Sequence, residues 1–156
     1  MSEIRFYHLT RSPLEMTLPG LLEKSLQRGW RVLVQCEGQS QLEFLDERLW
    51  TAPLDSFLPH GKAADENPEQ QPVLLATDQN NLNDANVLML VGGAQSTPEK
   101  MAGFELACLF FDGNDPAAVD AARRDWKAVT DANLQAVYWA QDNDGRWQQK
   151  AKSGGA

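Results

Sequence analysis

The chain has 156 residues, of which 42% are hydrophobic and 23% charged, and this length and composition are typical of one globular domain with one core. No apolar run approaches the roughly 20 residues that a membrane-spanning helix needs, so we expect no membrane association. The formal net charge is −8. Because binding to a phosphate backbone depends on Lys and Arg, this balance argues against strong direct binding to nucleic acid and favours protein partners.

Targeting signals and cysteines narrow the class of protein further. The N-terminus lacks a basic segment followed by an apolar one, which is the pattern of a secretory signal peptide, so we expect a cytoplasmic protein. The two cysteines, Cys36 and Cys108, each lie in an apolar run that resembles a strand. A metal site needs paired ligands at short spacing, and a secreted disulfide scaffold needs more cysteines. We therefore predict two buried free thiols, with no metal and no cofactor.

The chain begins with a predicted strand and helix. Residues 3–8 mix apolar and polar side chains and predict a first strand. Pro13 suits the first turn of a helix, with Ser12 as its cap, and leucines then recur at helical spacing until Gly29. The Pro-Gly pair at 19–20 interrupts this pattern, so the first turns are expected to form a separate loop.

A second strand and helix follow. The apolar run at 31–36 lacks polar alternation, as expected for a strand covered on both faces. The next helix is predicted to begin at Ser40, with Leu42, Leu45 and Leu49 on or near one face. Strand, helix, strand and helix in this order indicate an α/β sheet with crossover helices.

The second half of the chain continues this alternation after a long loop. Residues 51–72 contain four prolines among polar residues and predict an ordered loop followed by a mobile one. The remaining predicted elements are strands at 73–76, 87–91, 104–111, 134–139 and 146–149, a short helix at 98–102, and a helix from Asp115-Pro116 to about Asn133. We therefore predict one Rossmann-like, three-layer α/β/α domain over residues 1–150, with a mixed but mainly parallel sheet, and a disordered tail at 151–156.

Residues that could carry catalysis are few and scattered. Neither the phosphate-binding loop pattern nor the dinucleotide-binding glycine pattern occurs, and Gly92-Gly93 is predicted to end a strand at a turn. His8 and His60 are far apart in sequence, and no Ser or Cys lies in the context of a catalytic nucleophile. We predict no catalytic residue. The alternative is a small Rossmann-like nucleotide-binding enzyme, which would need a pocket at the C-terminal ends of the parallel strands.

Three segments together resemble the signature of the DNA polymerase III chi family. They are the strand Gly29-Trp-Arg-Val-Leu-Val-Gln-Cys-Glu37, the helix end Leu45-Asp-Glu-Arg-Leu-Trp50, and the loop Pro53-Leu-Asp-Ser-Phe-Leu-Pro-His60. The start of the chain, Phe6 to Leu9, also fits this pattern. The resemblance covers the first 60 residues well, is weak across the middle, and returns at Ala122-Arg-Arg-Asp-Trp-Lys127.

The resemblance implies an adaptor rather than an enzyme. Members of this family have no known catalytic activity, and they link the clamp loader of the polymerase, through the psi subunit, to single-stranded-DNA-binding protein. The ligand on that second protein is an acidic C-terminal tail, which ends in an apolar residue with a free carboxylate. A receptor for such a tail needs an apolar pocket, a cation for the carboxylate and a basic rim for the acidic residues upstream.

The resemblance also implies which residues bind the tail. Arg123 and Lys127 fall on the family positions that supply cations, Trp126 falls on its aromatic position, and Trp50 and Phe57 fall on its pocket-forming aromatics. Without the resemblance, Trp126 is as well explained as a core residue, the two cations as a solvated helix face, and Trp50 and Phe57 as core or loop anchors. The chain departs from its relatives near Thr130, where they carry another basic residue, and this departure predicts a weaker site.

Overall fold

One mixed sheet of eight strands forms the centre of the computed structural model, which describes residues 2–10, 13–51, 59–78, 80–142 and 144–153. Along the sheet the strands follow the order β3-β4-β2-β5-β6-β1-β7-β8. The strands are β1 (Glu3–Leu9), β2 (Val32–Gln35), β3 (Gly61–Lys62), β4 (Val73–Ala76), β5 (Val87–Leu90), β6 (Leu106–Asp112), β7 (Gln135–Gln141) and β8 (Trp147–Ser153). The helices are α1 (Leu14–Gln27), α2 (Gln39–Trp50), α3 (Pro98–Met101) and α4 (Pro116–Asp131), with a 3-10 turn η1 (Pro68–Gln70).

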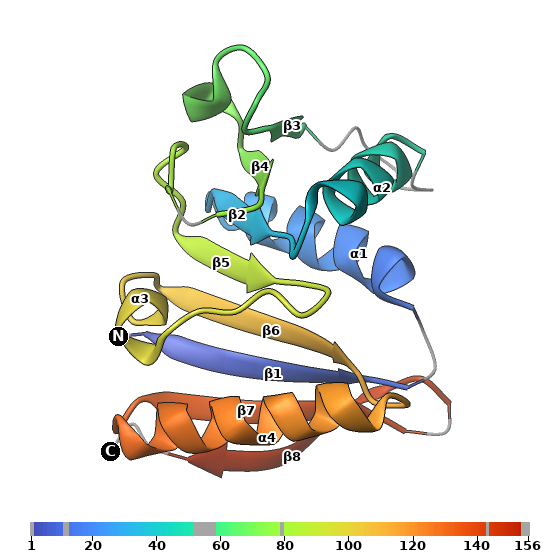
Figure 1. Ribbon diagram of the computed structural model, residues 1–156, viewed down its shortest axis with the longest axis vertical. Coiled ribbons are helices and arrows are strands. Elements are labelled where there is room, and N and C mark those ends of the chain that lie inside the picture. Colours follow the sequence, from blue (N-terminus) through green and yellow to red (C-terminus); the bar gives the residue numbers. More distant parts are fainter. Residues whose placement is uncertain (1, 11–12, 52–58, 79, 143, 154–156) are drawn as a thin grey trace.

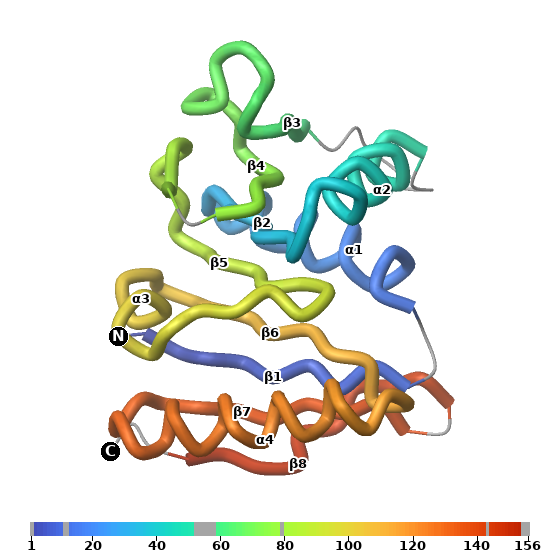
Figure 2. The backbone as a smooth tube through the Cα atoms, viewed as in Figure 1, coloured from blue at the N-terminus to red at the C-terminus, as the bar shows by residue number. Residues whose placement is uncertain are grey.

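Strands that are distant in the sequence lie side by side in this sheet (Figure 2). The first strand, β1, pairs in parallel with β6 on one side and with β7 on the other. All the pairings are parallel except that of β7 with β8 at one edge. The carboxyl ends of β1, β2, β5 and β6 therefore meet at one end of the sheet, where α1, α2 and α4 begin (Figure 1).

Alternate side chains of each strand point to opposite faces, and each face is covered by its own helices. On one face, Val32, Val34 and neighbouring strand residues pack with the leucines of α1 and α2. On the other face, Leu33 and its neighbours pack with residues of α3 and α4. The predicted three-layer α/β/α domain is thus confirmed, and both thiols are buried as predicted.

Several predicted elements differ from the observed ones at their ends. The helix α1 continues through Pro19, because this proline is buried with Leu18 and Leu22, and their packing offsets the missing backbone hydrogen bond. The predicted cap Ser12 lies outside the described residues. The helix α4 does begin as predicted, with Asp115 accepting a hydrogen bond from the backbone N–H of Ala117.

The edge strand β8 is longer than the predicted strand at 146–149. It runs from Trp147 to Ser153 and pairs with β7 over its length, with an irregularity in register between Tyr138 and Trp139. Three of the residues predicted as tail therefore belong to a strand, and residues 154–156 lie outside the described part of the chain. In the predicted loop at 51–72, the structure contains β3 and η1, and residues 52–58 again lie outside the described part.

Candidate functional site

The two predicted cations lie on the outer surface of α4. The side chains of Arg123 and Lys127 are each 77% exposed and, at a spacing of four residues, lie on the same side of the helix. Each has an acidic neighbour on the same helix: Arg123 Nη1 lies 3.9 Å from Asp120 Oδ1, and Lys127 Nζ donates to Asp131 Oδ2 at 2.8 Å. Because these exposed pairs are screened by water, both cations can exchange their acidic neighbour for an external carboxylate.

Trp126 lies between these cations in the sequence of α4 and packs against the core. Its ring meets that of Phe6 edge-on at a centroid distance of 5.3 Å and that of Tyr138 at 5.9 Å. The residue is nevertheless half-buried rather than fully enclosed. The ring therefore stabilises the contact of α4 with the sheet, as the interpretation of Trp126 as a core residue predicts, and its role in binding the tail stays a prediction.

An aromatic cluster beside Arg123 was not predicted from the sequence. The ring of Phe111 lies 5.0 Å from His8 and 6.0 Å from Tyr138, and Tyr138 Oη lies 2.6 Å from His8 Nδ1. Burial lowers the pKa of His8 and raises that of Tyr138, and the charge of Arg123 lowers both. Arg123 is thus electrically coupled to this cluster. The three rings come from β1, β6 and β7, so only the pairing of these strands could reveal the cluster.

The predicted aromatic Trp50 lies in the other helical layer. It is the last residue of α2 and is 57% exposed, and its ring contacts that of His60 at a centroid distance of 4.5 Å, with the two planes tilted by 51°. His60 is itself buried, and its Nε2 lies 3.3 Å from Asp46 Oδ1. Phe57 lies outside the described residues. The structure therefore brings Arg123, Trp126 and Lys127 together on α4 and places Trp50 on α2, across the sheet from them (Figure 1).

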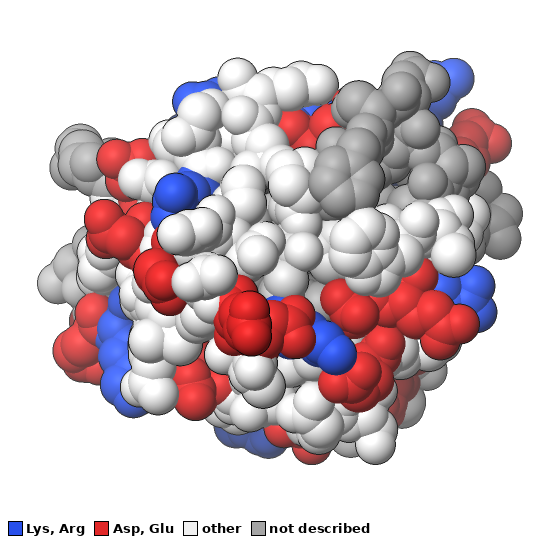
Figure 3. All heavy atoms as spheres, turned by 90° about the horizontal axis from the view of Figure 1, so that it is seen from above, with Lys and Arg blue, Asp and Glu red and all other residues white. Residues whose placement is uncertain are grey.

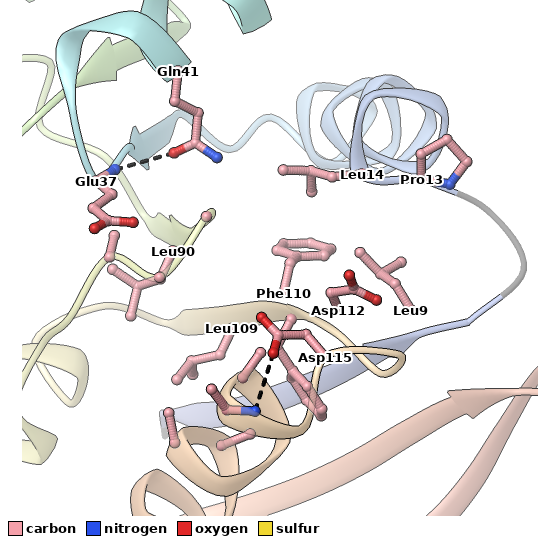
Figure 4. Close-up of a pocket in the computed structure, with 18 of the residues that line it drawn as sticks. Leu9, Pro13, Leu14, Glu37, Gln41, Leu90, Leu109, Phe110, Asp112 and Asp115 are labelled. Atoms are coloured by element: carbon pink, nitrogen blue, oxygen red, sulfur yellow. Dashed lines mark hydrogen bonds between the residues drawn. The ribbon is translucent and has the colours of Figure 1, made fainter.

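A cleft of about 840 Å³ opens at the carboxyl ends of the parallel strands. Its walls come from the strand ends of β1, β5 and β6 and from the first turns of α1, α2 and α4. In Figure 4, Glu37 and Gln41 lie on one side of this cleft, and Asp112 and Asp115 lie on the other. Open α/β sheets bind ligands at such a position, which makes this cleft the place to test the alternative of a nucleotide-binding enzyme.

The chemistry of the cleft does not fit a nucleotide. Its lining includes five acidic residues and neither Lys nor Arg among the described residues: Glu15, Glu37, Asp112, Asp115 and Asp125. The start of α4, which would otherwise attract a phosphate, is occupied by the capping carboxylate of Asp115, and Pro116 has no N–H to offer. The turn at Gly92-Gly93, predicted as such, has both glycines in the left-handed region and packs against Gln41 and Glu37.

The described residues also contain no cluster of three or more His, Cys, Asp or Glu side chains placed to hold a metal ion. The two histidines remain apart, since His8 contacts Tyr138 on the α4 side of the sheet and His60 contacts α2. Among the helices that the structure describes, none is both long and apolar enough to cross a bilayer.

Most charged side chains of this protein are acidic, as its net charge of −8 shows. On the face shown in Figure 3, acidic side chains gather in clusters, whereas Lys and Arg are scattered. Each of the two predicted cations on α4 lies beside an exposed carboxylate, Arg123 beside Asp120 and Lys127 beside Asp131, so the charges of these four side chains balance. An acidic ligand that meets the two cations would be held more weakly at high salt than at low salt, because salt screens exposed charges.

The comparisons with known proteins agree on one protein family. The model of the family described as "DNA polymerase III chi subunit, HolC" matches residues 1–137. The chain is 28% identical over 91 residues to the probable DNA polymerase III subunit chi of Rickettsia prowazekii, covering 58% of this chain and 55% of that protein. It is 35% identical over 68 residues to DNA polymerase III subunit chi of Escherichia coli, covering 44% of this chain and 46% of that protein. The matched regions thus span about half the length of these relatives.

Proposed function

Because the chain belongs to the DNA polymerase III chi subunit family, we propose that it is a non-catalytic adaptor of the replicative polymerase. In this proposal it links the clamp loader, through psi or an equivalent subunit, to the C-terminal tail of single-stranded-DNA-binding protein. The observation that carries the proposal is the family match over residues 1–137. Work on replicating DNA would place the protein in the cytoplasm.

The exposed side chains of Arg123 and Lys127 on α4 are the proposed contact for the tail. Arg123 and Lys127 are exposed and four residues apart, so they can meet the terminal carboxylate and an acidic side chain upstream of it. Arg123 would meet the carboxylate with two parallel hydrogen bonds, which its planar guanidinium allows. The half-buried ring of Trp126 offers apolar surface beside them.

Trp50 and Phe57 remain part of the proposal as a second, apolar contact. The ring of Trp50 contacts His60 and is 57% exposed, and in this proposal its exposed part meets an apolar side chain of the tail. Although Trp50 lies across the sheet from α4, an extended segment of ten residues spans up to about 33 Å, which is comparable to the diameter of a domain of this size. One flexible tail can therefore contact both helical layers by passing around an end of the sheet.

A weak contact is sufficient for this role. Single-stranded-DNA-binding protein coats its substrate, so many tails are displayed along one strand, and a second tether to the clamp loader raises the effective concentration of each contact. The adaptor thus works by keeping the polymerase near coated single strands. It requires no chemical step.

The test is a fluorescence-anisotropy titration with a labelled peptide of the acidic C-terminal tail, at low and at moderate salt. We expect wild type to bind in a salt-sensitive way, and Arg123→Ala and Lys127→Ala each to weaken binding about fivefold, the effect of losing one charge-assisted contact of about 1 kcal/mol. Lys100→Ala, which removes an exposed cation from α3, is the matched control and should leave the dissociation constant unchanged. Absence of binding by wild type, or equal weakening by the control, would contradict the proposal.

A further inference from the structure

The cleft at the strand ends combines an apolar floor with an acidic rim. Side chains of Leu9, Leu14, Leu90 and Phe110 contribute apolar surface to it (Figure 4). At its mouth, Phe44 of α2 is 43% exposed, so the apolar surface continues onto the outside of the protein. A volume of about 840 Å³ is large enough for several amino-acid side chains.

None of the described residues that line the cleft is a Lys or Arg, and the guanidinium of Arg48 lies outside the lining, over the ring of Phe44 at 5.1 Å from its centroid. Asp125 is half-buried, and its carboxylate forms no hydrogen bond or ion pair with any residue that the structure describes. Burial raises the pKa of Asp125, while the charge of the adjacent Arg124 opposes this effect. Asp112 and Asp115 each use one oxygen to accept a backbone N–H, which leaves their negative charge in the cleft.

Helix α4 separates the negative charge of the cleft from the positive charge of the proposed tail site. Asp125 lines the cleft, whereas Arg123 acts on His8 and Tyr138 at the side of β7. Two residues apart in a helix lie about 160° from each other around the axis, so the two charges face opposite flanks. The charged side chains in the described lining of the cleft are all acidic, so the cleft repels an acidic ligand and attracts a basic one.

We propose that this cleft binds a basic peptide segment of a partner protein, in which Lys or Arg alternates with apolar residues. The cations would meet Glu37, Asp112 and Asp125 on the rim, where charge-assisted hydrogen bonds to carboxylates are strong. The apolar side chains would cover the floor and Phe44, which a small polyamine could not do. This inference concerns a different surface from the tail site and does not depend on the proposed function.

The experiment uses the full chain and two labelled, amidated hexapeptides, one alternating leucine with lysine and arginine and the other alternating leucine with glutamate. We expect the basic peptide to bind by fluorescence anisotropy and the acidic one not to bind. The double variant Glu37→Gln with Asp125→Asn removes two rim charges without changing side-chain size, and we expect it to weaken binding at least tenfold. Glu99→Gln with Glu105→Gln removes the same charge from exposed positions outside the cleft lining and is the matched control.

The position of the bound peptide is checked by NMR. The chemical shifts of the backbone amides of Gly93 and Ala121, which both line the cleft, are followed as the peptide is added. Shifts at both amides on adding the basic peptide, with the tenfold loss in the cleft variant alone, would establish the site. Equal weakening by the control pair would mean that the peptide responds only to net charge and would overturn the proposal. Absence of binding, or binding of spermidine as tight as that of the peptide, would overturn it as well. If circular dichroism shows that the double variant is misfolded, the single variant Asp125→Asn replaces it in the same binding experiment.

Discussion

The hydroxyl of Tyr138 lies 2.6 Å from Nδ1 of His8, so the parallel strands β1 and β7 are joined by a side-chain hydrogen bond as well as by their backbone ladder. The pair lies beside Phe111 and within the electric field of Arg123 on α4. It therefore connects the sheet to the flank of the helix that we propose as the tail site.

We expect Tyr138→Phe to lower the free energy of unfolding by about 1 kcal/mol, because it removes this hydrogen bond and keeps the ring in place. Urea unfolding followed by circular dichroism measures the change. The ring contacts with Phe6 and Trp126 remain in the variant, so a loss of several kcal/mol would show that the hydroxyl has a further role.

The pKa of His8 should report the charge of Arg123. Burial lowers this pKa below its ordinary value of 6.5, and Arg123 lowers it further, so Arg123→Ala is expected to raise it in an NMR titration. Lys127→Ala is the control, since Lys127 is not among the groups that act on His8. An unchanged pKa in the Arg123 variant would contradict the coupling of α4 to the aromatic cluster.

The lowered pKa of His8 also predicts how the free energy of unfolding changes with pH. With its pKa lowered in the folded state, His8 binds a proton more readily in the unfolded chain. Its contribution to stability is therefore complete above pH about 6.5 and declines as the pH falls through 6.5 toward the lower folded pKa. Urea midpoints at pH 7.5 and pH 5.5 should differ less in His8→Gln than in wild type.

Leu88→Ala should be strongly destabilising, by about 2 to 5 kcal/mol, because it leaves a cavity in the middle of the sheet. Leu88 is fully buried on β5, between β2 and β6. Leu82→Ala makes the same chemical change at a side chain that is 47% exposed, and it should alter the free energy of unfolding by no more than about 0.5 kcal/mol. Similar losses in both variants would contradict the observed burial.

Gly92→Ala tests the turn at the edge of the cleft. Gly92 has φ of 64°, and an added Cβ would collide with the side chain of Gln41, whose Oε1 accepts the backbone N–H of Glu37. Gly29 has φ of 79°, but a Cβ added there would meet no atom within 4 Å apart from its own neighbours in the chain. Gly29→Ala therefore measures the backbone strain alone, which is about 1 kcal/mol. We expect Gly92→Ala to lose more stability than Gly29→Ala in urea unfolding, and an equal loss would show that Gln41 moves aside freely.

Neither thiol should react in the folded protein. Burial raises the pKa of Cys36 and that of Cys108 to about 12, so almost no thiolate forms at pH 8. Ellman's reagent should therefore detect no thiol in the native protein. It should detect both thiols in about 8 M urea, a concentration at which we expect the protein to be completely unfolded. Rapid reaction of either cysteine under native conditions would indicate local opening of β2 or β6.

Local patterns in the sequence were enough to predict the class of fold and most of its elements. The uninterrupted apolar run around Val32 predicted a strand covered on both faces, and the run at 104–111 predicted a further strand. Asp115-Pro116 likewise predicted the start of α4, because these signals depend on residues next to one another in the chain. The helical spacing of Arg123 and Lys127 likewise predicted that they share one side of a helix.

Contacts between distant parts of the chain decided the rest. Burial against the sheet keeps Pro19 inside α1, and pairing with β7 extends β8 to Ser153, although neither segment shows these outcomes in its own residues. The order of the strands places Trp50 and Trp126 in different helical layers and brings His8 beside Tyr138. It also gathers acidic residues of α1, of the turn between β2 and α2, of β6 and of α4 around one cleft. Side-chain periodicity defines a face of each element, and only packing against other elements decides what that face meets.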